Sequence, residues 1–128
     1  MTLSVHVFVV GEDGKPEVLD TPEIGAELAG WEYWRAAVWG SDAVRALGAR
    51  YFPVLAGADL TVSPNEVQGF LDECAWLRAN IDAVAPHPDP GRPQDTHGET
   101  VAAISRRLGN IEDAARRAVN VGGGVIIW

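Results

Sequence analysis

The chain is poor in several residue types that carry recognisable chemistry. It has a single cysteine, Cys74, which excludes an internal disulfide and a cysteine-rich zinc site. One lysine and nine arginines stand against 18 acidic residues, for a net charge of −8. A field of that sign repels phosphate backbones, so we do not expect nucleic-acid binding. The charge favours a basic protein partner, cations or simple solubility.

Long apolar runs are also missing. No stretch approaches the roughly 20 apolar residues that span a bilayer, and the N-terminus lacks the basic region and cleavage site of a signal peptide. We therefore expect a cytoplasmic protein without membrane contact. Scarce lysine beside many arginines, alanines and glycines is typical of a GC-rich bacterial genome and says nothing about mechanism.

Catalytic motifs are absent as well. The chain has no Gly-x-Ser-x-Gly elbow and no His-Glu-x-x-His pair, and glycines 122–124 follow a helical segment as a helix stop rather than a phosphate loop. His87, Asp89, Asp95 and His97 lie close in sequence, but their spacing matches no ligand frame, which favours a solvated loop. We predict no catalytic residue, no metal and no cofactor.

What remains is a globular composition, with 47% hydrophobic and 22% charged residues. A chain of 128 residues is the size of one domain, residues 1–128, and buries roughly two-thirds of its unfolded surface. Alternation predicts a strand over residues 3–10, and an edge strand at 17–19 returns from it in a hairpin. Short strands are also predicted at residues 59–62 and 125–128, the last beside the first strand.

Helical periodicity marks two long segments. Ser63–Val84 begins with a capping-box pattern and carries one apolar stripe, and Gly98–Asn120 carries another. Shorter helices are predicted at residues 31–39 and from Ser41 to a break near Pro53. Residues 21–23 also resemble a helix start, and residues 86–98 are predicted to form a loop. The prediction is an α+β fold, with a mainly antiparallel sheet of three or four strands packed against two long helices.

Two charged residues interrupt the stripes. At 100° per residue, Arg78 lies about 40° from Cys74, and Glu112 lies about 40° from Leu108, each inside its apolar arc. The two form a buried pair if the long helices pack face to face. We favour the alternative of two local pairs, in which Arg78 reaches Asp82 and Glu112 reaches Arg116, each four residues further along its own helix.

Trp76 breaks the pattern in the opposite sense, on the polar face beside Asp72, Glu73 and Asn80. We favour the interpretation that Trp76 is covered within the chain, by the aromatic segment or by the 86–98 loop. The alternative is that Trp76 is exposed to solvent and acts as an aromatic anchor with an acidic rim.

The cluster of Trp31, Tyr33, Trp34 and Trp39 is treated as core rather than as a stacking platform for a ligand. His6 is expected to be a partly buried histidine of the first strand rather than a base.

The leading functional hypothesis is a non-enzymatic acidic interaction protein, of the immunity or adaptor type, which binds a basic protein through Trp76, Asp72, Glu73 and Asn80. The alternative is a small-molecule-binding domain or minor enzyme with a pocket between sheet and helices. That pocket would hold His6, Arg78 and Glu112 as its polar groups. A third hypothesis is a homodimer formed by pairing of the C-terminal strand.

Overall fold

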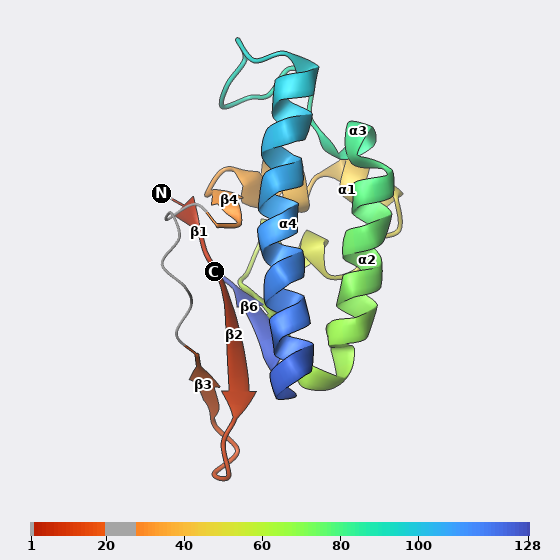
Figure 1. The fold of residues 1–128 in the computed structure, drawn as a ribbon. Coiled ribbons are helices and arrows are strands. Elements are labelled where there is room, and N and C mark those ends of the chain that lie inside the picture. The colour runs from red at the N-terminus through yellow and green to blue at the C-terminus, as the bar shows by residue number, and fades with distance from the viewer. Residues whose placement is uncertain (1, 20–27) are drawn as a thin grey trace.

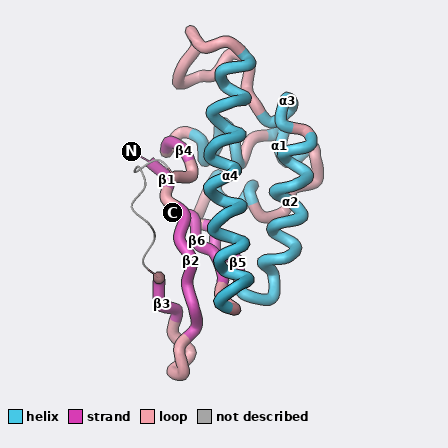
Figure 2. Tube along the Cα trace, in the orientation of Figure 1, coloured by secondary structure: helices cyan, strands magenta, loops and turns pink. Residues whose placement is uncertain are grey.

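The computed structural model describes residues 2–19 and 28–128. Its fold is α+β, as predicted: the long helices cover one face of a small antiparallel sheet (Figures 1 and 2). The helix start predicted at residues 21–23 lies outside the described residues. None of the described helices is long and apolar enough to cross a bilayer.

Four strands form the main sheet, in the order β3-β2-β6-β5, and two short strands pair separately. The strands are β1 (Thr2–Leu3), β2 (Val5–Val10), β3 (Pro16–Val18), β4 (Gly30–Trp31), β5 (Leu60–Val62) and β6 (Gly124–Ile127). The predicted hairpin is present, and within the described residues β3 is the end strand of the sheet, beside β2. The C-terminal strand lies beside the first strand, as predicted, with Val7 opposite Val125.

The position of β6 argues against the proposed strand-paired dimer. Its two sides are already occupied, by β2 on one and by β5 on the other. A second copy could pair with β6 only after displacing one of these strands.

The helical elements differ in length from the prediction. They are η1 (Arg35–Trp39, a π-helix), α1 (Asp42–Ala46), η2 (Phe52–Ala56, a 3-10 helix), η3 (Pro64–Glu66, a 3-10 helix), α2 (Val67–Ala79), α3 (Ile81–Val84) and α4 (His97–Val121). The predicted 31–39 helix is shorter than expected: Trp31 lies in β4, a turn follows, and η1 begins only at Arg35, although Gly40 ends it as expected. Ser41 caps α1 as predicted, but the chain turns at Gly48, where φ is 90°, before it reaches Pro53.

The predicted helix Ser63–Val84 is not continuous. Its first turn is the 3-10 helix η3, and the Ser63 hydroxyl bonds the Glu66 carboxylate instead of a backbone N–H, so the predicted capping box does not form. At Asn80 the backbone leaves the helix, with φ −117° and ψ 27°, before α3 begins. The Asn80 side chain donates to the Trp76 carbonyl, a local bond that competes with helix continuation.

Helix α4 matches its prediction within a residue at each end. Thr96 and Glu99 form a capping box at its start, and Gly122 ends it in the left-handed conformation at φ 66°. Its predicted stripe packs toward α2 and the sheet, and Ile104, Leu108 and Ile111 are fully buried.

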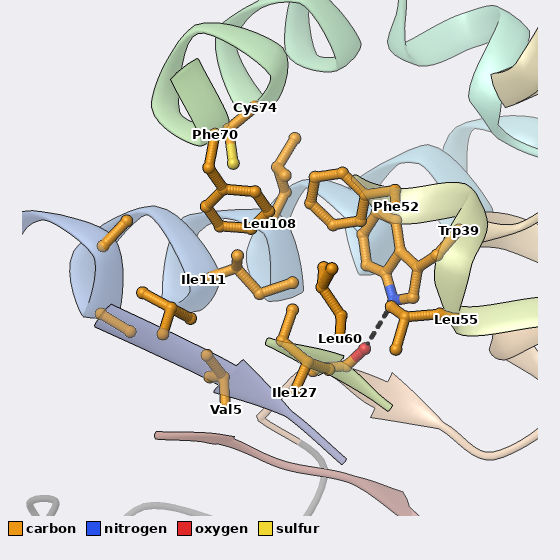
Figure 3. Close-up of a cluster of buried hydrophobic side chains, with 14 of the residues drawn as sticks. Val5, Trp39, Phe52, Leu55, Leu60, Phe70, Cys74, Leu108, Ile111 and Ile127 are labelled. Carbon is orange, nitrogen blue, oxygen red and sulfur yellow. Dashed lines mark hydrogen bonds between the residues drawn. The ribbon is translucent and has the colours of Figure 1, made fainter. Parts of the chain in front are cut away.

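The core lies between these two helices and the sheet (Figure 3). Val5, Ile127 and Leu60 lie opposite one another across three strands and point into it. Phe70 and Cys74 of α2 close it from above, and no solvent reaches either. The space between sheet and helices is therefore filled by side chains.

Candidate functional site

Trp76 is half exposed, with 51% of its surface accessible. Its indole N–H donates to the Leu47 carbonyl, over 2.8 Å. This hydrogen bond joins Trp76 to the segment after α1, and among the described residues no hydrogen bond or ring contact joins it to the aromatic segment or the 86–98 loop. The hydrogen bond fixes the ring against the surface, with much of its area open to solvent.

The predicted acidic rim is mostly engaged within the chain. The Glu73 carboxylate accepts the backbone N–H groups of Arg50, Tyr51 and Phe52 at 2.6–3.2 Å and so caps the start of η2. Asn80 bonds the backbone of its own helix. Asp72 is exposed, with a single bond from Gln68. One of the three rim residues thus keeps a charged group directed to solvent.

Arg78 and Glu112 form the inter-helix pair, and the favoured local pairing was wrong. The Arg78 Nη2 and Nε atoms lie 2.5 and 3.1 Å from Glu112 Oε1, and Nη1 donates to the Ser105 hydroxyl at 2.8 Å. The hydrogen bond to Glu112 raises the pKa of Arg78. The pair is asymmetric in burial, with 10% of the Glu112 side chain exposed and 39% of the Arg78 side chain.

His6 does not join that pair. Val5 points into the core (Figure 3) and Val7 is also buried in it, so the intervening side chain lies on the opposite face of the sheet. There its Nδ1 accepts a hydrogen bond from the Trp128 indole at 3.0 Å, with the rings edge to face at 5.8 Å. The predicted pocket of His6, Arg78 and Glu112 is therefore not formed, because the filled core and the sheet separate them.

The aromatic cluster is divided between core and surface. Trp34 and Trp39 are buried, as predicted, whereas Trp31 and Tyr33 are only partly buried. The Trp31 and Tyr33 rings stack, with centroids 6.5 Å apart and planes 17° apart. Trp34 meets the Trp31 ring edge to face at 5.2 Å. Trp34 and Trp39 thus form the buried part of the cluster, and Trp31 and Tyr33 form its partly exposed part.

The loop between α3 and α4 contacts the partly exposed part of the cluster through a hydrogen bond from Tyr33. The Tyr33 hydroxyl donates to Asp89 Oδ1 at 3.0 Å, and the Gly91 N–H donates to the same oxygen at 2.9 Å. Burial is the main cause that raises the pKa of Tyr33, and the hydrogen bond to the Asp89 carboxylate adds to it. A Cβ on Gly91 would lie 2.3 Å from the Tyr33 ring, so glycine permits this contact.

Between this loop, the aromatic cluster and the first half of α4 lies a surface pocket of about 440 Å³. In Figure 1 the loop lies at the N-terminal end of α4, and β4 lies beside the same half of that helix. We call this cavity the aromatic–arginine pocket. The described residues that line it are Trp31, Trp34, Asp89, Arg92, Asp95, Glu99, Thr100, Ala102, Ala103, Arg106 and Arg107.

Three guanidinium groups line this pocket in a chain of net charge −8. That of Arg107 lies 4.5 Å from the centre of the Trp31 ring, and that of Arg92 lies 5.7 Å from it, both within cation–π range. Arg107 is buried, with 6% of its surface exposed, whereas Arg106 is exposed. The pocket therefore combines fixed positive charge with an aromatic wall.

The sequence contained one signal for this pocket that our prediction did not use. Arg107 lies four residues before Ile111, which places it about 40° away, as far inside the α4 stripe as Glu112. The contributions of Arg92 and Asp89 had no such signal, because they depend on how the loop folds back over the aromatic cluster.

The four loop residues considered for metal binding do not converge. Asp89 serves Tyr33, and Asp95 accepts from Arg92 at 3.1 Å. The His87 and His97 rings meet edge to face at 5.4 Å. Within residues 2–19 and 28–128, no group of three or more histidine, cysteine or carboxylate side chains is placed to hold a metal ion.

Comparison of the chain with protein-family models, with curated proteins and with solved structures gave no match. The pocket geometry is therefore the basis of the functional argument.

Proposed function

We propose that the protein is a small-molecule-binding domain and that its site is the aromatic–arginine pocket. The observation that carries the proposal is a pocket of ligand size, about 440 Å³, whose lining combines a tryptophan wall backed by the core with three arginines. Ligand pockets typically measure about 300–1,000 Å³ and combine apolar walls with a few polar groups. The proposed ligand site therefore differs from the predicted pocket of His6, Arg78 and Glu112 and lies at the N-terminal half of α4.

The test uses the indole N–H resonances in the nuclear magnetic resonance spectrum, assigned with single tryptophan variants. The probes are naphthoate and its uncharged amide, naphthamide. We expect Trp31 and Trp34 to shift with saturation, while Trp76 and Trp128 do not. Phenylalanine at Ala102, an exposed residue of the pocket wall, should block these shifts. The same substitution at exposed Ala79 of α2 is the matched control and should leave them unchanged.

A second function, binding of a basic protein, is favoured by one observation: Trp76 is half exposed yet held in place by its hydrogen bond to Leu47. A rigid exposed tryptophan is a frequent interface anchor. The engaged Glu73 and Asn80 leave Asp72 as the charged contact. Capture of one defined protein from native lysate, lost in Trp76→Ala but kept in Trp128→Ala, would support this function. Equal capture by both variants would contradict it.

The cytoplasmic compartment and the bacterial origin also remain proposals, which rest on composition alone. Fractionation of source cells, with detection of the protein in the soluble cytoplasmic fraction, tests the compartment. Recovery with the membrane or extracellular fraction would contradict it.

A further inference from the structure

We propose that the ligand of the aromatic–arginine pocket is a planar organic molecule with a single carboxylate. This inference rests on the proposed ligand-binding function and names the chemical class that the site selects. It follows from three features of the pocket: which charged groups are already engaged, which donors remain, and the field of the whole chain.

The carboxylates of the pocket are occupied by the protein itself. Asp89 accepts from Tyr33 and from a backbone N–H, and Asp95 accepts from Arg92. The Glu99 carboxylate accepts the Thr96 N–H in the capping box, and this hydrogen bond lowers the pKa of Glu99. These three acids thus have hydrogen-bonded roles in the loop and helix cap.

Guanidinium donors remain on the same rim. Arg92 bonds Asp95 through Nε, and no described residue accepts a hydrogen bond from its two Nη groups. Arg106 is exposed and makes no hydrogen bond or ion pair within the described part of the chain. A guanidinium offers a planar fork of N–H donors that matches a carboxylate in two parallel bonds. The buried guanidinium of Arg107 places a third positive charge at the tryptophan wall, 4.5 Å from the centre of the Trp31 ring.

The aromatic wall of the pocket limits the shape of the uncharged part of the ligand. Trp31 presents aromatic surface, the buried Trp34 lies behind it in edge-to-face contact, and Ala102 and Ala103 add small apolar side chains. The Trp34 Nε1 atom is enclosed just beneath this surface, and none of the described residues accepts a hydrogen bond from it. A flat body therefore fits the wall better than a branched one. An organic cation is disfavoured, because two guanidiniums already lie within cation–π distance of Trp31.

The number of charges on the ligand is limited by the whole chain. A protein of net charge −8 repels approaching anions, and this repulsion grows with the charge of the ligand. Three acids also lie within the pocket lining. A single carboxylate meets the rim arginines at the smallest electrostatic cost, whereas a nucleotide phosphate carries about two charges into the same field.

The test compares dissociation constants of naphthoate, naphthamide and adenosine monophosphate for the full chain, measured by the indole shifts at low salt. Naphthoate should bind at least about tenfold more tightly than naphthamide, the effect of one charge-assisted hydrogen bond. Adenosine monophosphate should bind more weakly than naphthoate. Arg106→Gln should weaken naphthoate binding about fivefold or more and leave naphthamide binding unchanged. Arg116→Gln, at an exposed arginine of the same helix outside the pocket, is the control.

The outcomes separate the inference from the function on which it rests. Equal affinities for naphthoate and naphthamide, both blocked by Ala102→Phe, would overturn the carboxylate inference and leave the ligand site in place. Tighter binding of adenosine monophosphate would overturn the single-charge argument. No saturable shift of Trp31 or Trp34 with any probe would overturn the proposed function itself.

Discussion

The pair between Arg78 and Glu112 permits a quantitative test of how α2 and α4 are joined. Breaking a fully buried ion pair typically costs about 3–5 kcal/mol, because the remaining charge stays buried. Here only Glu112 is deeply buried, at 10% side-chain exposure against 39% for Arg78. Arg78→Met therefore strands the buried carboxylate and should cost about 3 kcal/mol, the lower end of that range. It also removes two hydrogen bonds to Ser105.

The reverse substitution should cost less. Glu112→Gln leaves a guanidinium that reaches solvent, so we expect a loss of about 2 kcal/mol, close to the value of a hydrogen bond to a charged group. The double variant should lose about 3 kcal/mol, which corresponds to a coupling energy near 2 kcal/mol. Urea denaturation followed by circular dichroism supplies the four free energies of unfolding.

The exposed pair of Arg116 and Asp113 is the matched control on the same helix. With 63% and 72% of their side chains exposed, these two residues should show a coupling below about 0.5 kcal/mol. Simple additivity of Arg78→Met and Glu112→Gln, or a larger loss for Glu112→Gln than for Arg78→Met, would refute the reasoning.

Three further predictions concern other features of the fold. Glu73→Ala should destabilise the protein by about 2 kcal/mol, because three backbone N–H groups lose a charged acceptor, whereas Asp72→Ala should change stability by less than about 0.5 kcal/mol; urea denaturation measures both. Burial raises the pKa of the Cys74 thiol, so a thiol reagent at pH 8 should react only after unfolding. Truncation after Gly124 removes most of the central strand β6 and should abolish the cooperative thermal transition seen by circular dichroism.

The periodic parts of the fold were readable from sequence because burial imposes a regular spacing. The alternation of residues 5–10, the stripe of α4 and the C-terminal strand all depend on one face meeting the core. The strand predicted over residues 3–10 is divided at Ser4, because Leu3 belongs to β1, which pairs with β4 in a separate sheet. The class of fold followed from these elements. Helix α2 was predicted too long, because the stripe continues through α3 and gives no sign of the backbone break at Asn80.

The candidate site was less accessible to prediction because tertiary contacts build it. Glu73 looked like a surface acid, since its partners are backbone groups 21 to 23 residues away in sequence. Arg92 joins Trp31 only after the loop is fixed by Asp89 and Tyr33. Arg107 was the exception, because its place inside the α4 stripe could have been read by the same angular count that identified Glu112.

The aromatic–arginine pocket, rather than the Trp76 surface or the core, is the proposed binding site. A titration of naphthoate followed by the indole N–H resonances tests it most directly. Binding in this pocket should give saturable shifts of Trp31 and Trp34, no shift of Trp76 or Trp128, and loss of the response in Ala102→Phe. Unchanged Trp31 and Trp34 resonances, or a response confined to Trp76, would contradict it.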